Sequence, residues 1–424
     1  MAGPLAGVRV LDLTTVLVGP YCTQILAEMG AEVLKVEAPE GDVVRLIGPA
    51  RHPGMGCMFL TVNRGKRSVA LDLKRPEGQD ALLRLARRAD VLVTNIRPRA
   101  MARLGLGYDE VRAVNERIVY ASVLGYGQDG PYAAQPAYDD LMQGATGVAS
   151  LNGRGAGGEE EAPRYVPLAM VNRITGLAAV GAINAALVHR EHTGDGQRVE
   201  VPMFEAMAGF VLGDHLGGRV FDPPLDGGGY ARLLSPGRRP YRTRDGFVCT
   251  MIYNDRQWRA FCAAAGLPDL VSEDPRFASH ATRTENIDAI LAMVERVFAE
   301  RTTAEWMEVL EGADLPVAPV HTLDSIVRDP HLAASGFFAT EEHPTEGRLV
   351  RMAPAARFSA GDAAPPRPAP RLGEHGEEAL REAGYTEEEI AALLKSGAVR
   401  ADVQAPAPAT GPDASRGDGP GVPP

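Results

Sequence analysis

Residues 7–37 read GVRVLDLTTVLVGPYCTQILAEMGAEVLKVE, and their pattern decides the class of fold. Two short aliphatic runs, GVRVLDL and AEVLKVE, enclose the helical segment GPYCTQILAEMG. Parallel strands cannot be joined by a tight turn and need a crossover connection, which is usually a helix. This stretch therefore predicts a parallel strand pair joined by a helix.

The same alternation continues along the chain. SVALDL, the charged helical segment PEGQDALLRLARRA and DVLVTNI follow, and RIVYASVLGYG adds another buried strand. Together these segments predict an α/β fold with a mostly parallel sheet. Farther on, the almost uncharged stretch ITGLAAVGAINAALV at 174–188 predicts a buried helix, with Asn172 and Arg173 at its entrance.

Turn-rich sequence between 222 and 246 marks a change of domain. We expect residues 1–222 to begin a large domain and to contain its ligand site. A smaller α+β domain should span 223–328, where the aromatic and aliphatic residues recur at helical spacing and indicate a core. Residues 329–396 should return to the large domain. Residues 397–424 are dominated by Ala, Pro and Gly and are predicted to be a disordered tail.

Bulk composition excludes several classes of protein. The net charge of -11 argues against nonspecific binding to nucleic acid or to an anionic membrane. The four cysteines lie far apart without a CxxC pair, which predicts neither a metal site nor a disulfide framework. The start of the chain lacks a signal-peptide pattern, and the longest apolar run is shorter than the roughly 20 residues that span a bilayer. We expect a soluble cytoplasmic protein with small-molecule partners.

GYGQDG at 125–130 matches the GxGxxG pattern of dinucleotide-binding loops. The following residues, PYAAQPAYDD, contain two prolines and offer no helix on which a pyrophosphate would rest. We interpret the motif as a glycine turn before a functional loop.

Several blocks, taken in order, resemble the class III (CaiB/BaiF-type) CoA-transferase family over nearly the whole chain apart from the tail. They are LAGVRVLDLTTVLVGPYCTQILAEMGAEVLKVEAPEGDVVR, VNRGKRSVALDLKRPEG, GYGQDGPYAAQPAYDDLMQGATGV, AALVHREHTGDGQRVEVPMFEAM and RLGEH. The resemblance implies a Rossmann-like large domain built from both ends of the chain and a smaller domain between them. It also implies ring-like protomers threaded together as an interlocked homodimer.

The resemblance also implies the chemistry. In the family an aspartate attacks an acyl-CoA thioester, and CoA passes to an acceptor carboxylic acid. CoA is then a substrate, and no separate cofactor is expected. The family motif Asp-x-x-x-Gly places that aspartate at Asn172, four residues before Gly176. An amide cannot easily replace a carboxylate as nucleophile. We predict that Asn172 both caps the helix and lies in the active-site cleft, with Arg173 on the surface.

Nearby residues offer alternatives. Racemases of the family would pair a histidine with the aspartate, and the matching position here is Tyr138, so racemase activity is disfavoured at both positions. Asp139 and Asp140 follow directly. Either carboxylate could replace the missing nucleophile, or one of them could simply cap the next helix.

Six further positions match CoA-contacting sites of the family. Lys74 and Arg103 have the charge that suits the phosphates of CoA. The full set is Val16, Leu17, Leu71, Lys74, Asn95 and Arg103.

Three functions remain open. The first is CoA transfer between an acyl-CoA and a carboxylic acid. The second is an acyl-CoA binding protein that has lost the transfer step, which Asn172 favours. The third is altered thioester chemistry, isomerisation or hydrolysis, in which the Asn172 amide donates a hydrogen bond to the thioester carbonyl.

Overall fold

The computed structural model of the chain describes residues 3–153, 162–361 and 367–400. They form two compact units. The first combines Met1–Met142, Pro167–Ala208 and a C-terminal segment that begins at Pro330, and the second combines Gln143–Val166 with Gly209–Asp329. The change of unit after Ala208 precedes the turn-rich sequence at 222. Helix α9 (Met203–His215) runs through this boundary, so no turn residues mark it.

A seven-stranded sheet forms the centre of the first unit, in the order β12-β3-β2-β1-β4-β5-β6. The strands are β1 (Arg9–Leu13), β2 (Glu32–Glu37), β3 (Lys66–Leu71), β4 (Val91–Thr94), β5 (Val119–Leu124), β6 (Gln197–Pro202) and β12 (Val399–Arg400). Every pairing is parallel except that of β12 with β3. The predicted α/β class with a parallel sheet is confirmed.

Strand β12 corrects the prediction for the tail. Val399 pairs with Leu71 and Arg400 with Ala70, so the residues directly after the last helix complete an edge of the sheet. Val399 is buried in the core, which explains why these residues are ordered despite the composition of the segment that follows. The rest of the predicted tail, 401–424, lies outside the described residues.

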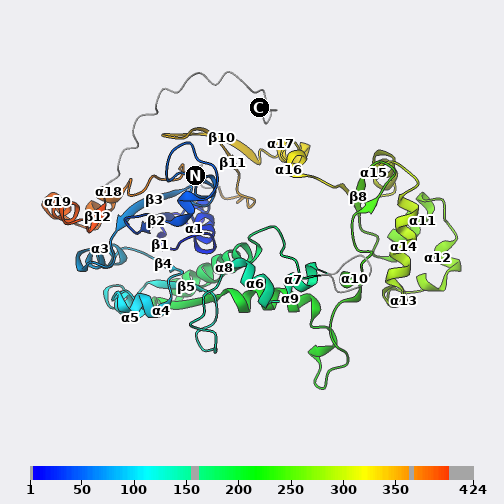
Figure 1. Cartoon of the computed structure of the whole chain (residues 1–424), viewed down its shortest axis with the longest axis horizontal. Coiled ribbons are helices and arrows are strands. Elements are labelled where there is room, and N and C mark those ends of the chain that lie inside the picture. The colour runs from blue at the N-terminus through cyan, green and yellow to red at the C-terminus, as the bar shows by residue number, and fades with distance from the viewer. Residues whose placement is uncertain (1–2, 154–161, 362–366, 401–424) are drawn as a thin grey trace. The chain divides into compact units, whose positions relative to one another are not determined.

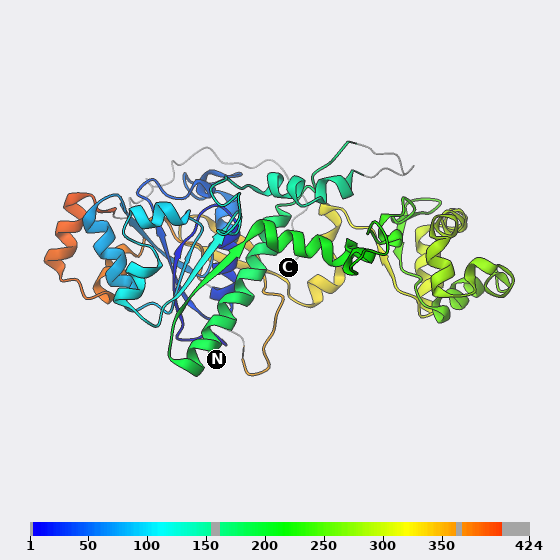
Figure 2. The same cartoon turned by 90° about the horizontal axis from the view of Figure 1, so that it is seen from below.

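Helices cover both faces of this sheet (Figures 1 and 2). Val10 of β1 faces a core shared with α1 (Val18–Glu28) and α8 (Met170–Thr193). Its neighbour Leu11 faces the opposite core, because successive strand residues point to opposite faces. That second core is shared with α3 (Pro76–Ala86), α5 (Tyr108–Val114), α18 (Gly376–Glu382) and α19 (Glu387–Ser396).

Helix α8 contains the predicted buried helix 174–188. Val171, Ala179, Ile183 and Leu187 are buried in the unit, which confirms the prediction. By length and composition α8 would suffice to cross a membrane, and it is the one such helix in the described part of the chain. Core helices of globular proteins pass the same test, so this property is weak support for a membrane span.

Smaller elements complete the first unit. A separate antiparallel hairpin joins β10 (Phe338–His343) to β11 (Gly347–Met352). The remaining helices of the first unit are η1 (Val43–Leu46), α2 (Cys57–Val62), α4 (Pro98–Arg103) and α17 (Pro330–Ala334). Helix α6 (Asp139–Ala145) crosses from the first unit into the second, and α7 (Val148–Asn152) belongs to the second.

The second unit has its own sheet and core. Strands β7 (Tyr241–Arg242), β8 (Phe247–Thr250) and β9 (Val317–Pro319) pair antiparallel. Trp258, Phe261, Phe298 and Trp306 are buried together, as their helical spacing predicted. The helices are η2 (Gly217–Val220), α10 (Ala231–Leu234), α11 (Asp255–Ala264), α12 (Leu270–Glu273), η3 (Pro275–Phe277), α13 (His280–Glu285), α14 (Ile287–Phe298), α15 (Thr303–Gly312) and α16 (Leu323–Ile326).

Candidate active site

The strand order reverses between β1 and β4, and ligands of open α/β sheets bind at the carboxyl ends of the strands at such a point. Two predicted site segments meet there. The Asn95 side chain, after β4, accepts a hydrogen bond from the Thr15 N–H at 3.0 Å and donates one to the Thr15 carbonyl at 2.9 Å. Asn95 thereby fixes the turn that follows β1.

Val16, in the same turn, has a backbone φ of 65°. This left-handed conformation is unfavourable for a β-branched residue and is found where the surroundings enforce it, often at functional sites. The enforcing contact is visible, because the Val16 N–H donates to both carboxylate oxygens of Asp42 at 3.1 and 3.2 Å. Asp42 is in turn held by the Lys35 ammonium at 3.0 Å.

Beneath the turn lies a fully buried ion pair. The Lys66 ammonium is 2.9 Å from an Asp12 carboxylate oxygen, and the Thr14 and Thr23 hydroxyls donate to the same carboxylate. Burial by itself would raise the pKa of Asp12, but the ammonium groups of Lys66 and Lys35 and the two hydroxyls hold it well below its usual value. Burial lowers the pKa of Lys66 to about 8, although the Asp12 charge opposes this shift. Sequence reasoning missed this network, whose only signal was charged residues within apolar strands.

The start of α8 packs closely on the start of α1. A Cβ on Gly176 would lie 3.0 Å from both the Val18 carbonyl oxygen and the Tyr21 ring. The Arg173 guanidinium lies over the Tyr21 ring, 4.3 Å from its centre. Arg173 is therefore half-buried against α1, whereas the sequence predicted a surface position; burial lowers its pKa. This packing brings the entrance of α8 beside the turn that contains Val16 and Leu17.

Asn172 is half-buried in the first turn of α8. Its backbone N–H and its side-chain Nδ2 both donate to Oδ1 of Asp139, each at 2.9 Å. The prediction that Asn172 caps the helix is wrong, since α8 begins earlier and the N-cap residue is Ala169. The carboxylate of Asp139, at the start of α6, satisfies a free N–H of the first turn instead.

The structure thus joins two of the three predicted catalytic residues. Asp139 is half-buried and in contact with Asn172, whereas Asp140 is exposed. The Tyr138 side chain is 69% exposed. The loop that carries these residues packs on the end of β5, where a Cβ on Gly125 would lie 2.2 Å from the Ala137 side chain.

The remaining predicted CoA contacts differ in accessibility. Lys74 and Arg103 are exposed, and within the described residues neither cationic group has a hydrogen bond or ion pair. Leu17 is half-buried and precedes α1. The Leu71 side chain is fully buried in the core, next to β12, so only its backbone could face a ligand.

The GxGxxG segment follows β5 without a helix behind it. Its Gly127 N–H donates to the Glu205 carboxylate at 3.0 Å, and the Gln128 N–H donates to Glu200 at 2.8 Å. The N–H groups that would bind a pyrophosphate therefore already bind carboxylates of the chain itself. The interpretation of this motif as a glycine turn, and not as a pyrophosphate-binding loop, agrees with these contacts.

Known proteins resemble the chain over nearly its whole length. The succinyl-CoA:glutarate CoA-transferase of Mus musculus is 32% identical, with 93% of this chain and 90% of that protein covered. The formyl-CoA:oxalate CoA-transferase of Escherichia coli is 32% identical, with 94% of this chain and 100% of that protein covered. The probable fatty acyl-CoA transferase Rv3272 of Mycobacterium tuberculosis is 34% identical, with 88% and 96% covered.

Solved structures agree. The crystal structure of Rv3272 matches with a TM-score of 0.76 at 32% identity, over 89% of this chain and 99% of that chain. A CaiB/BaiF family protein from Brucella suis matches with a TM-score of 0.75 at 29% identity, over 90% and 100%. Residues 5–376 match CoA-transferase family III. The switch-point turn and the entrance of α8 form the candidate site described above. By these matches, the chain belongs to CoA-transferase family III.

Proposed function

We propose that the protein transfers CoA from an acyl-CoA to a carboxylic acid, and that Asp139 supplies the carboxylate at the position next to Asn172. The contact between Asn172 Nδ2 and Asp139 Oδ1 carries this proposal. It places an anionic oxygen beside the residue that replaces the family's nucleophile. CoA transfer is also the reaction in the names of the mouse and Escherichia coli relatives.

In this mechanism a carboxylate oxygen of Asp139 attacks the thioester carbonyl. A carbon–oxygen bond forms, the carbon–sulfur bond breaks, and CoA leaves as a thiolate with a mixed anhydride on Asp139. The thiolate then attacks the aspartyl carbonyl, which releases the first carboxylic acid as its carboxylate and leaves an aspartyl-CoA thioester. The acceptor carboxylate opens this thioester in the reverse sequence. No other cofactor is needed, since CoA is a substrate.

Binding of CoA is assigned to the switch point. Val16 and Leu17 lie in a turn whose backbone is fixed by Asn95 and Asp42, so a ligand would meet a preformed surface. The exposed cations Lys74 and Arg103 suit the phosphate groups of CoA on charge grounds.

An acyl-CoA binding protein without transfer activity is the second candidate. The observation in its favour is that Oδ1 of Asp139 already accepts two hydrogen bonds from Asn172, which makes that oxygen a poorer nucleophile. Hydrolysis or isomerisation is a third candidate, in which the Asn172 amide would donate a hydrogen bond to the thioester carbonyl. In the structure Nδ2 of that amide donates to Asp139 instead. Racemase chemistry is disfavoured, because an amide at 172 and an exposed phenol at 138 cannot exchange a proton as a carboxylate and an imidazole do.

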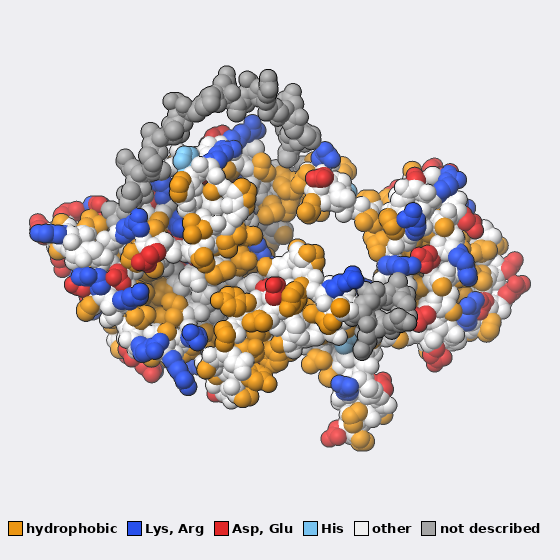
Figure 3. Space-filling view, viewed as in Figure 1, with side chains coloured by type: hydrophobic (Ala, Val, Ile, Leu, Met, Phe, Trp, Pro, Cys, Tyr) orange, Lys and Arg blue, Asp and Glu red, His pale blue; other side chains and the backbone are white. Residues whose placement is uncertain are grey.

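We further propose a Rossmann-like large domain built from both ends of the chain, with the smaller α+β domain formed by the sequence between them. We also propose a homodimer of interlocked ring-like protomers and a cytoplasmic location. The strand order of the sheet is that of doubly wound nucleotide-binding folds. In the dimer, we expect the exposed apolar residues Leu177 and Val188 of α8 to be covered. Figure 3 shows hydrophobic side chains gathered over the region of α6 and α8. The four cysteines are free, as in a reducing compartment.

The test is covalent trapping. The protein is incubated with an acyl-CoA, treated with hydroxylamine, and its peptides are analysed by mass spectrometry. A hydroxamate on the peptide that contains Asp139, lost in Asp139→Asn and retained in Asp140→Asn, is the expected result. Turnover should fall by about a thousandfold or more in Asp139→Asn. Full turnover in Asp139→Asn would exclude this mechanism, and acyl-CoA binding without turnover would favour the binding protein.

A further inference from the structure

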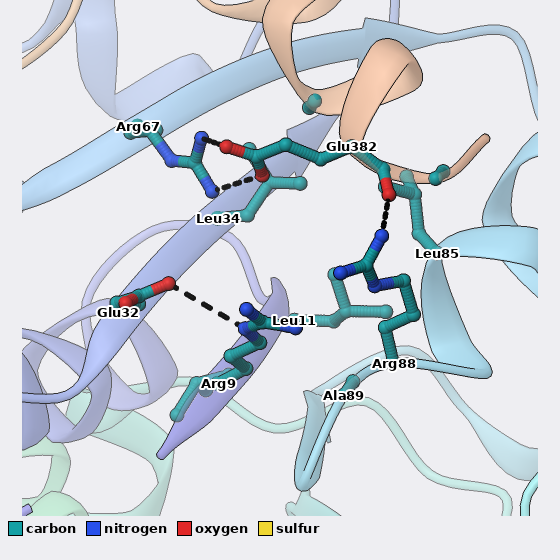
Figure 4. A pocket seen from close by; sticks show the side chains of 12 residues that line it. Arg9, Leu11, Glu32, Leu34, Arg67, Leu85, Arg88, Ala89 and Glu382 are labelled. Atoms are coloured by element: carbon teal, nitrogen blue, oxygen red, sulfur yellow. Dashed lines mark hydrogen bonds and ion pairs between the residues drawn. The ribbon is translucent and has the colours of Figure 1, made fainter. Parts of the chain in front are cut away.

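A cavity of about 140 Å³ lies at the amino-terminal ends of the strands, opposite the candidate active site (Figure 4). Arg9 and Glu32, the first residues of β1 and β2, line it together with Arg67 near the start of β3. The ends of α3 and α18 form its other walls. Because a strand rises about 3.3 Å per residue, the length of β1 separates this cavity from the turn at Val16 by roughly 16 Å or more.

The charged groups around the cavity are unequally paired. Arg67 binds Glu382 through two parallel hydrogen bonds of 2.8 and 2.9 Å and Glu378 through a third of 3.0 Å, so its charge is neutralised by carboxylates of the chain. Arg9 meets Glu32 only at 3.6 Å, with both side chains about half exposed at 48% and 55%. Such surface pairs contribute little and are easily exchanged for another partner.

Arg88 is the unpaired cation. Its guanidinium donates to the backbone carbonyl of Glu382, and it forms no ion pair with a carboxylate among the described residues. In Figure 4 the Arg88 and Arg9 side chains lie on the side of the cavity opposite Arg67, and the Arg88 guanidinium reaches the backbone carbonyl of Glu382. Two guanidinium groups with spare donors therefore face one region, which favours an anion.

The floor of the cavity is aliphatic. Leu11, Leu34 and Leu85 line it, together with alanines from α18 and from the segment after α3. An engineered apolar cavity of about 150 Å³ holds benzene, a molecule of six carbons. A cavity of about 140 Å³ therefore has room for a short aliphatic chain but not for a long acyl group. An inorganic anion would leave this apolar floor uncovered.

We propose that this cavity is a second ligand site, which binds a short-chain aliphatic monocarboxylate. The carboxylate pairs with Arg88 and Arg9, and the chain lies on the three leucines. Such a ligand also bridges the sheet and α18, an element from the far end of the sequence, and so should stabilise the first unit when it binds.

The probe is hexanoate, titrated by calorimetry into the full-length protein at low ionic strength, where surface charges are least screened. The expected result is binding that weakens about tenfold or more in Arg88→Gln, a loss of about 1.4 kcal/mol. Arg87→Gln removes the same charge one residue away, outside the cavity, and should bind as the unaltered protein does. Ala383→Met fills the cavity without changing its charge and should also abolish this binding.

Ligand chemistry provides the second control. Hexylammonium has the same chain with the opposite charge and should not bind there, and acetate lacks the chain and should bind at least about tenfold more weakly than hexanoate. Hexanoate can also occupy the candidate active site, so only the binding that Arg88→Gln and Ala383→Met remove counts for this proposal. Hexanoate binding that neither variant changes, or that hexylammonium matches, would overturn it. Loss of transfer activity in Asp139→Asn tests the proposed function alone and does not bear on this second ligand site.

Discussion

Replacement of Asn172 by Asp tests the contact on which the proposed function depends. In the unaltered protein, Asn172 Nδ2 donates to the Asp139 carboxylate at 2.9 Å. Asn172→Asp places a second carboxylate oxygen at that distance. Two unit charges 2.9 Å apart repel by about 1.4 kcal/mol in water and by about 6 kcal/mol at an effective dielectric constant of about 20.

Both side chains are half-buried, so the repulsion should fall between these limits. The pair will then hold one proton, and the pKa of one carboxyl should rise from about 4 to between about 5 and 7. A folded-state pKa above the unfolded value means that the native state binds more protons within that interval. The stability of Asn172→Asp, relative to the unaltered protein, should be greatest below about pH 4 and fall as the pH rises through 5 to 7. The total loss is about 1.4 to 4 kcal/mol.

Urea unfolding at several pH values between about 4 and 8 measures this loss. The double variant, which combines Asn172→Asp with Asp139→Asn, exchanges the two residues. An amide then faces a carboxylate again, so the double variant should lose the pH dependence. Gln135→Glu adds the same negative charge at an exposed position nearby and controls for the change in net charge. A stability difference between Asn172→Asp and the unaltered protein that stays constant from pH 4 to 8 would refute the contact. Failure of the exchange to restore pH independence would refute the assigned pairing.

Three further outcomes follow from the region around the β1 turn. Lys66→Met leaves the buried Asp12 carboxylate without its ion-pair partner and should cost about 3–5 kcal/mol of stability in urea unfolding. Gly19→Ala places a Cβ 2.2 Å from the Thr14 side chain. Because Asp12 accepts a hydrogen bond from that side chain and holds it in place, the substitution should reduce the free energy of unfolding by about 1–3 kcal/mol and lower the melting temperature. Asn95→Ala removes two hydrogen bonds to the turn and should cost about 1–3 kcal/mol, with weaker CoA binding by calorimetry; unchanged CoA affinity would separate this turn from the CoA site.

Local pattern determined much of the fold. The strand and helix periods of residues 7–37 predicted β1, α1 and β2, because the side-chain period depends only on the local backbone. The apolar stretch at 174–188 likewise predicted a buried helix. The tail prediction was wrong at Val399, since pairing with β3 stabilises a strand whose composition gives no local sign of it.

Part of the site was also predictable. Similarity to the family directed attention to position 172 and to the turn at Val16, and the sequence alone shows that the residue at 172 is an amide. It could not show that Asp139 accepts two hydrogen bonds from Asn172, because these residues are 33 positions apart and belong to different helices.

Tertiary structure decided the contacts that the sequence left open. Asn95 reaches Thr15 across 80 positions because β1 and β4 are neighbours that end side by side. Lys66, the first residue of β3, reaches Asp12 across 54 positions because β3 lies two strands from β1 in the same sheet. The cavity between Arg9 and Arg88 exists because α18, from the far end of the sequence, packs beside the amino-terminal ends of the strands. Periodicity fixes which way a side chain points within its own element, whereas the distance between side chains of separate elements depends on how those elements pack.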